Sequence, residues 1–260
     1  MKPDYNYHTH TVRCHHAVGT DEEYVLAAID AGIKVLGFAD HVFVPGIRDR
    51  RSRGDYSELE GYIDSINALK AKYADQIEIH LGFEAEYVKA LEGYYRELLD
   101  SGRIEYLIQG QHCTFNPARH TTLYYLQYLS GKGMRRYVDD LIAGMESGLY
   151  SYVAHPDYFA HRIHPGKPLF DEYSREILSA AEALRIPLEI NLGHHTVDKE
   201  RNEDRFATRR FFELAGEYDV SVIIGSAAHD PKDFRITDYD YAYTLIKDYG
   251  LKEITRLPMK

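Results

Sequence analysis

Short apolar runs typical of β-strands alternate with longer helical patterns along almost the whole of this 260-residue chain. The seven strand candidates are "DYNYH" (4–8), "VLGFADH" (35–41), "IEIHLGFE" (77–84), "YLIQGQH" (106–112), "SYVAH" (151–155), "PLEINLG" (187–193) and "VSVIIGS" (220–226). The clearest helical patterns cover residues 20–32, 56–73, 134–148, 170–185 and 204–218. Repeated strand–helix units build a parallel sheet with helices outside it. The pattern therefore predicts an α/β fold, a closed or nearly closed barrel that forms a single domain over residues 1–260.

The composition argues against several classes of protein. The hydrophobic fraction of 44% is sufficient for one substantial core, and the net charge of −10 disfavours a general nucleic-acid surface. No apolar run is long enough to span a membrane, and the first residues lack the apolar core of a signal peptide. Two cysteines do not make a disulfide framework, so we expect a cytoplasmic enzyme with no nucleic-acid or membrane partner. The unusual number is 14 histidines, because His is the commonest metal ligand.

Polar residues stand at the ends of nearly all the predicted strands. In a (β/α) barrel these ends converge on one axis, where the following loops build the active site. The residues in question are His8, His10, His41, Glu84, His112, His155 and His229. Each has an ordinary explanation when taken alone: a surface pair for His8 and His10, a helix cap for His41, a satisfied core histidine for His112 or His155. Their joint placement instead predicts a shared metal site, since Glu is seldom buried without a partner.

Further residues on the same face are candidates for contact with a small phosphorylated substrate. Arg162 follows the fifth strand and is the first candidate for gripping phosphate, while Arg48 belongs to a basic loop after the second strand. Such a loop could draw in an anion, although loops of this kind are usually just solvated. His194 and His195, after the sixth strand, could also touch substrate. Asp40, next to a strand-end histidine, could orient a ligand or act as a general acid.

Seven motifs in a fixed order carry a resemblance to a known family. They are "HTH" (8–10), a further His16, "ADH" (39–41), "GFE" (82–84), "QGQH" (109–112), "AHPD" (154–157) and "GSAAH" (225–229). Together they resemble the polymerase-and-histidinol-phosphatase (PHP) superfamily, and most closely its histidinol-phosphate phosphatase branch. The resemblance implies a distorted seven-stranded, TIM-like (β/α) barrel with a metal site at the carboxyl ends of the strands. It also implies two to three divalent transition metals, Zn, Mn or Fe.

The resemblance assigns ligands position by position. The first metal would be held by His8, His10 and Glu84. The second would share Glu84 and add His112 and His155, and the third would be held by His16, His41 and His229. One position departs from the family, because Ala227 stands where the family has Asp and an alanine cannot ligate. A deliberate substitution or a natural variant would explain Ala227, and both predict weakened metal binding and activity.

The expected chemistry is hydrolysis of a phosphate ester. Imidazole-rich sites suit Zn²⁺, Mn²⁺ or Fe and disfavour Mg²⁺ and Ca²⁺. Metals that share a carboxylate lie roughly 3.5–4 Å apart and supply hydroxide at neutral pH for in-line attack on phosphorus. We assign Asp40, Glu84 and His229 to catalysis. Because no Ser or Cys nucleophile is needed, Cys14 and Cys113 are expected to be small buried thiols.

Three functions remain open at this point. The first is a metal-dependent phosphomonoesterase that converts L-histidinol phosphate to L-histidinol and phosphate in histidine biosynthesis. The second keeps the metals but acts on a phosphotyrosine, a nucleotide or a nucleic acid, and the net charge of −10 disfavours the nuclease. The third is a barrel that binds metal or ligand with weakened or no turnover because of Ala227. The segment "NLGHHTVDKERNEDR" (191–205) matches the histidinol-phosphate branch poorly, so the reaction class is better supported than the substrate.

Overall fold

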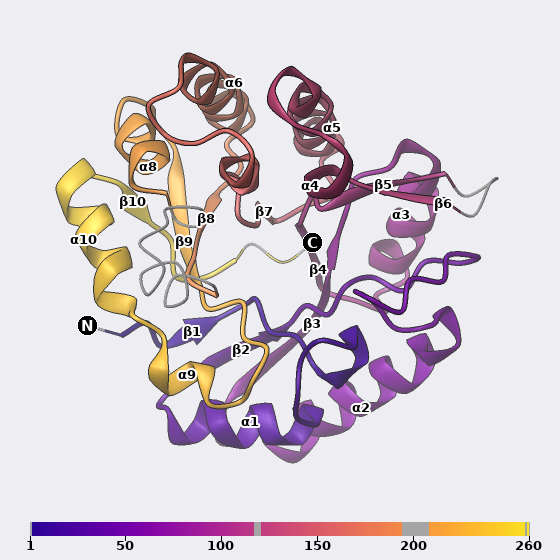
Figure 1. Ribbon diagram of the computed structural model, residues 1–260. Coiled ribbons are helices and arrows are strands. Elements are labelled where there is room, and N and C mark those ends of the chain that lie inside the picture. Colours follow the sequence, from indigo (N-terminus) through magenta and orange to yellow (C-terminus); the bar gives the residue numbers. More distant parts are fainter. Residues whose placement is uncertain (1, 117–120, 194–207, 258, 260) are drawn as a thin grey trace.

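The computed structural model in Figure 1 describes residues 2–116, 121–193, 208–257 and 259. A curled sheet of eight parallel strands lies at its centre, in the order β1-β2-β3-β4-β7-β8-β9-β10. These strands are β1 (Tyr5–Asn6), β2 (Val35–Phe38), β3 (Glu78–Ala85), β4 (Tyr106–Gln109), β7 (Tyr152–Val153), β8 (Leu188–Asn191), β9 (Ser221–Gly225) and β10 (Lys252–Glu253). All seven predicted strands are present. The structure adds β10 and an antiparallel hairpin of β5 (Cys113–Asn116) and β6 (Thr121–Tyr124).

The helices lie around the outside of the curled sheet (Figure 1). The longer ones are α1 (Asp21–Asp30), α2 (Leu59–Lys72), α3 (Glu92–Asp100), α5 (Arg135–Glu146), α6 (Pro168–Leu184), α8 (Arg209–Ala215) and α10 (Tyr239–Tyr249). The short ones are α4 (Tyr125–Tyr128), α9 (Asp233–Ile236) and the 3-10 turns η1 (Val12–Cys14), η2 (Tyr56–Glu58), η3 (Lys89–Leu91), η5 (Gly131–Met134) and η6 (Tyr158–His161). Each predicted helix is present in whole or in part, whereas α3 and α10 were not predicted. Residues 204–207 of the predicted fifth helix lie outside the described residues.

Helix α6 illustrates how the sequence produces this arrangement. Pro168 occupies its first turn, where the missing N–H of proline costs no hydrogen bond. Phe170, Ile177 and Ala181 are buried on one side of the helix, at the three- and four-residue spacing of an apolar stripe. The stripe faces inward, so the helix covers the sheet and leaves its polar side in water. No helix in the described ranges is both long and apolar enough to cross a lipid bilayer.

The two ends of the sheet meet at a seam beside β9. The first half of β9 pairs with β10, through Ser221 and Val222. Beyond the end of β9, Ala228 forms a parallel bridge with Thr9, which follows β1. The N–H of His10 donates to the Ala228 carbonyl at 2.9 Å, and the N–H of Ala228 donates to the His8 carbonyl at 3.1 Å. The seam therefore places the residues after β1 directly beside those after β9.

The side chain of Asn6 joins both sides of this seam. Its Nδ2 donates to the His8 carbonyl at 2.9 Å and to Thr9 Oγ1 at 2.8 Å. Its Oδ1 accepts hydrogen bonds of 2.9 Å from both the N–H and the hydroxyl of Ser226. Since Asn6 and Ser226 are buried, water cannot replace these bonds.

Replacing Asn6 with Ala should lower the free energy of unfolding by about 3 kcal/mol, because several buried polar groups lose their partners together. Denaturant titration followed by circular dichroism measures this loss. Asn67→Ala, at an exposed position of α2, is the matched control and should change stability by less than about 0.5 kcal/mol. Equal stability of the two variants would show that the seam does not hold the barrel together.

Candidate metal centre

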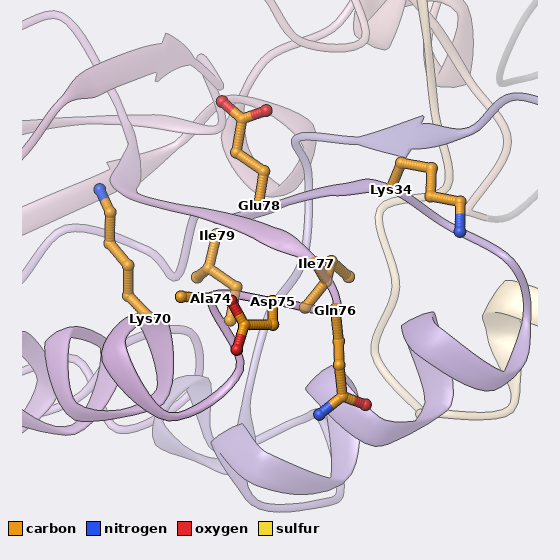
Figure 2. A pocket seen from close by; sticks show the side chains of 8 residues that line it. All are labelled: Lys34, Lys70, Ala74, Asp75, Gln76, Ile77, Glu78 and Ile79. Carbon is orange, nitrogen blue, oxygen red and sulfur yellow. The ribbon is translucent and has the colours of Figure 1, made fainter.

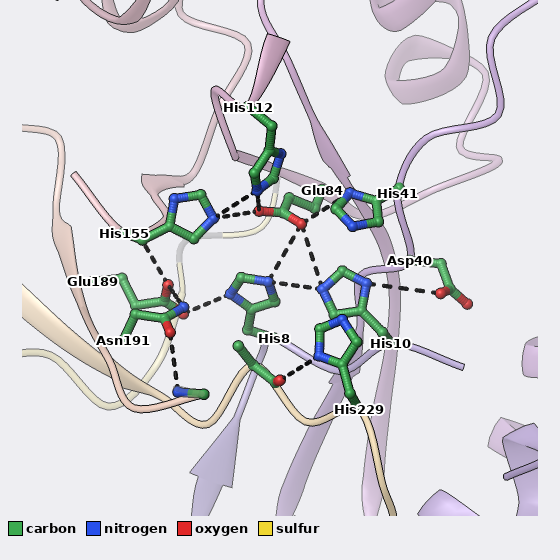
Figure 3. Close-up of polar contacts among 12 residues, drawn as sticks. His8, His10, Asp40, His41, Glu84, His112, His155, Glu189, Asn191 and His229 are labelled. Carbon is green, nitrogen blue, oxygen red and sulfur yellow. Dashed lines mark hydrogen bonds and ion pairs between the residues drawn. The ribbon is translucent and has the colours of Figure 1, made fainter. Parts of the chain in front are cut away.

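The residues at the carboxyl ends of the strands converge on the carboxylate of Glu84, which comes from β3 (Figure 3). The two oxygens of Glu84 face different imidazoles. Oε1 lies 2.8 Å from His155 Nε2 and 3.5 Å from His112 Nε2. Oε2 lies 3.1 Å from His41 Nδ1, 3.4 Å from His10 Nε2 and 3.5 Å from His8 Nε2. One buried carboxylate thus contacts two groups of histidines, and the prediction that it bridges two metals stays a prediction.

His229 and His16 extend the cluster on the side of His10. The ring of His229 stacks on that of His10 with 4.2 Å between centroids, and the ring of His16 lies 4.7 Å from that of His229. His16 Nδ1 lies 2.8 Å from the Cys14 carbonyl, and His229 Nδ1 lies 2.7 Å from the Ala227 carbonyl. A carbonyl can only accept, so both rings carry their proton on Nδ1. Metal binding by either ring would therefore use Nε2.

The ligand atoms fit divalent transition metals. His8 Nε2 and His10 Nε2 are 3.0 Å apart, and His112 Nε2 and His155 Nε2 are 3.1 Å apart. Two ring nitrogens this close repel unless a proton or a cation lies between them. Compact groups of three possible ligands, with all ligand atoms within 4.8 Å of one another, include His8–His10–Glu84 and His10–His41–His229. Imidazole with carboxylate is a ligand set that suits Zn, Mn or Fe.

Glu189 of β8 is a site residue that the sequence did not single out. Its Oε1 lies 2.8 Å from His8 Nδ1, and its Oε2 accepts a hydrogen bond of 2.7 Å from the side chain of Asn191. Burial lowers the pKa of His8, but Glu189 and then Glu84 outweigh this and raise it to about 10. A carboxylate behind a ligating imidazole orients the ring. A signal was present, because Glu189 interrupts an apolar strand where an unpaired carboxylate would be costly.

Asp40 is fully buried on the far side of His10. Its Oδ1 lies 3.8 Å from His10 Nδ1, and its oxygens accept hydrogen bonds from the N–H (2.9 Å) and the hydroxyl (2.5 Å) of Thr11. Burial raises the pKa of Asp40 to about 7, against these two hydrogen bonds. At 3.8 Å the contact with His10 is longer than a hydrogen bond, so both roles of Asp40, orienting a ligand and acting as a general acid, stay predictions.

Two glycines provide the space that the buried carboxylates occupy. A Cβ on Gly110 would collide with the carboxylate of Glu84, and a Cβ on Gly225 would collide with that of Glu189. Gly110 belongs to the segment after β4, and Gly225 ends β9. Close approach of a side chain to the backbone therefore explains a glycine at each of these two positions.

Ala227 lies between β9 and His229, with φ of +43°. This left-handed conformation is unfavourable for alanine by roughly 1–2 kcal/mol, whereas Asp and Asn adopt it more readily. The backbone at this position therefore suits the Asp that the resemblance leads us to expect. Its carbonyl still holds the His229 ring, since that contact needs no side chain.

Two of the four predicted substrate-binding residues, Arg162 and Arg48, contact groups outside the histidine cluster. Arg162 donates from Nε to the Leu126 carbonyl at 2.7 Å. The Arg48 side chain is 80% exposed and lies 3.4 Å from the Asp55 carboxylate. His194 and His195 lie outside the described residues. Contact of these four residues with substrate therefore stays a prediction.

The two cysteines, Cys14 and Cys113, are both buried and free. Cys14 lies among possible metal ligands, within 4.8 Å of ligand atoms of His16 and His229. The Cys113 thiol lies 3.4 Å from a carboxylate oxygen of Glu86. The prediction that both are small buried thiols is confirmed as far as burial is concerned.

A hollow lies at the opposite end of the sheet from the Glu84 cluster, where β2 and β3 begin (Figure 2). It has a volume of about 390 Å³, and Lys34, Lys70, Asp75 and Glu78 are among the residues that line it. Their charges are mixed, and none of the lining residues is a predicted site residue. The cluster around Glu84 is therefore the candidate functional site.

Known proteins resemble this chain over most of its length. The PHP domain family model matches residues 6–193. A Deinococcus radiodurans protein named "Probable histidinol-phosphatase" is 28% identical over 257 residues, which cover 95% of this chain and 94% of that protein. The "Histidinol-phosphatase" of Lactococcus lactis is 26% identical over 270 residues, which cover 97% of this chain and 93% of that protein.

A solved structure shows the same fold. The crystal structure of the Lactococcus lactis histidinol phosphate phosphatase, complexed with Zn, L-histidinol and phosphate, has a TM-score of 0.74 and 19% sequence identity. The match covers 99% of this chain and 100% of that chain. It confirms the predicted α/β class and its barrel-like arrangement.

Substituting Gly110 with Ala should weaken zinc binding at least tenfold, because the added methyl group displaces the Glu84 carboxylate from the position that the histidines share. Competition with a chromophoric chelator measures the zinc affinity, and circular dichroism checks the fold. Gly61→Ala is the control, since nothing lies within 4 Å of a Cβ at that helical position. Wild-type zinc affinity in a folded Gly110→Ala protein would mean that Glu84 is not a ligand.

Proposed function

The chain belongs to the PHP domain family, and on this premise we propose that it is a metal-dependent phosphomonoesterase acting on L-histidinol phosphate. The observation that carries the proposal is the cluster of imidazoles around the buried carboxylate of Glu84 (Figure 3). The substrate follows from the relatives of Deinococcus radiodurans and Lactococcus lactis, whose names specify histidinol-phosphatase.

The proposed centre holds two to three divalent transition metals, Zn, Mn or Fe. The proposed ligands are His8, His10 and Glu84 for one metal, Glu84, His112 and His155 for a second, and His16, His41 and His229 for a third. Such metals act as Lewis acids on phosphate oxygens and lower the pKa of water that they contact.

The residues of the chain prepare the site for this chemistry. Burial alone would raise the pKa of Glu84, but His112, His8 and His41 lower it well below its usual range. Glu84 therefore remains an anion that two groups of histidines can share. Glu189 orients the ring of His8 from behind, so this ring need not reorganise when a charged substrate enters.

The phosphate and the leaving group need contacts beyond the ligands. We assign the phosphate to Arg162 and Arg48, and further substrate contacts to His194 and His195. These assignments rest on the position of each residue after a strand of the barrel, on the face that carries the cluster. The cytoplasm is the proposed compartment, because free cysteines such as Cys14 and Cys113 suit a reducing environment.

A second candidate is a barrel that binds metal with weakened turnover, and Ala227 favours it. The first proposed metal has His8, His10 and Glu84 but no further carboxylate from position 227. The activity of the chain relative to a version with Asp at this position separates the two candidates.

Protein purified without a His-tag or added metal should contain two to three equivalents of transition metal by mass spectrometry. Chelation should abolish hydrolysis of histidinol phosphate, and Zn²⁺ or Mn²⁺ should restore it. Phosphotyrosine and nucleotide monophosphates are the comparison substrates in the same phosphate-release assay. If phosphotyrosine or a nucleotide monophosphate is hydrolysed faster than histidinol phosphate, that compound becomes the proposed substrate. Hydrolysis that continues after chelation, with no metal bound, would contradict the proposed metal-dependent function.

Ala227→Asp should raise turnover of histidinol phosphate at least tenfold, with tighter binding of one metal equivalent. Ala227→Asn is the matched control, because Asn also adopts the left-handed conformation but is a poorer ligand. A gain confined to the Asp version indicates a missing ligand. Equal gains in both versions would indicate relief of backbone strain instead, and no gain in either would favour the binding barrel.

A further inference from the structure

Arg53 belongs to the basic loop after β2, where the sequence suggests an exposed cation, yet its side chain is completely buried. Its Nη2 donates to both carboxylate oxygens of Glu86, at 2.9 and 3.0 Å. Its Nη1 donates to the carbonyl of Val42 at 3.0 Å, and the guanidinium lies 4.7 Å from the ring centre of Phe115. Arg53 is therefore committed to the interior and is not available to grip phosphate.

The Arg53–Glu86 pair contacts His112, one of the proposed metal ligands. Glu86 Oε1 lies 3.3 Å from Nδ1 of His112. Because a carboxylate accepts, this contact places a proton on Nδ1 of His112, so metal binding by this ring would use Nε2. That Nε2 lies 3.5 Å from Glu84 and 3.1 Å from His155 Nε2.

The other contact of Arg53 reaches a second histidine. Val42 follows His41 in the chain, so the Arg53–Val42 hydrogen bond fixes the backbone next to the His41 ring. The Nδ1 of His41 lies 3.1 Å from Glu84. One buried cation thus supports histidines from the segments after β2 and β4, and both histidines lie against the same carboxylate.

We propose that Arg53 and Glu86 are positioning residues of the metal centre, which hold His112 with Nε2 toward Glu84 and fix the backbone beside His41. The inference rests on the proposed function, because it concerns how that centre binds metal. A surface ion pair would not do this, since exposed pairs hold their side chains only weakly. A fully buried pair is rigid, because separating it leaves an unpaired charge inside the protein.

Two variants of the full-length protein test the proposal. Glu86→Gln keeps the volume of the side chain but removes its charge, and Arg53→Lys keeps the buried charge but cannot reach both Glu86 and Val42 with the same geometry. Glu217→Gln is the matched control, because it breaks another Arg–Glu pair, Arg175–Glu217, whose side chains are 44% and 52% exposed. Circular dichroism establishes which variants fold.

The first measurement is zinc affinity by competition with a chromophoric chelator. Glu86→Gln and Arg53→Lys should each bind zinc 10- to 100-fold more weakly than the wild type, and Glu217→Gln should match it. The second measurement is the ¹⁵N NMR spectrum of the His112 ring in metal-free protein. The wild type should show the proton on Nδ1, and the folded Glu86→Gln protein should show a changed population of the two tautomers.

The outcomes separate this inference from the proposed function. Wild-type zinc affinity and an unchanged His112 tautomer in either folded variant would overturn the positioning role, while zinc binding by the wild type would leave the proposed function standing. A wild type that binds none of Zn²⁺, Mn²⁺ and Fe²⁺ would end the proposed function, and the tautomer measurement would still decide the role of Glu86. If Glu86→Gln does not fold, the zinc affinity of Arg53→Lys decides.

Discussion

The buried carboxylate of Glu84 is the interaction on which the rest of the site depends. Imidazoles that follow β1, β2, β4 and β7 approach its two oxygens within 2.8–3.5 Å. An anion this deep in the protein needs cationic partners, either protonated rings or metals. The segments after these neighbouring strands must therefore lie at a common level, so that their rings reach one side chain of 1% exposure.

Two features of the surrounding structure keep these rings in place: the backbone seam and the polar groups behind the rings. The seam between Thr9 and Ala228 brings the segment after β1 to the segment after β9, and the rings of His10 and His229 stack as a result. Behind the rings, buried carboxylates contact Nδ1 of His8 and His112, and backbone carbonyls accept from Nδ1 of His16 and His229. These four rings are thus oriented before any metal or substrate binds, which limits the reorganisation that catalysis would require.

Much of the fold and of the cluster around Glu84 could be predicted, because both depend on neighbours in the chain. The alternation of apolar runs with helical patterns predicted seven strands, and the position of a polar residue just after a strand predicted Glu84 and its histidines. The strand β10 could not be predicted, since Lys252–Glu253 is a two-residue strand without an apolar pattern. Arg53 could not be placed either, because a run of arginines ordinarily indicates a solvated loop.

The sequence by itself determined which residues reach the carboxyl face of the barrel, because hydrophobic periodicity and distance from a strand end are local properties. Only the tertiary structure decided which buried polar side chains contact one another behind the cluster. His8 meets Glu189, 181 positions away, and Arg53 meets Glu86, 33 positions away. Close packing in the folded interior determines these pairs. A buried charge without a partner is costly, so a partner must come from a neighbouring element, however distant in the sequence.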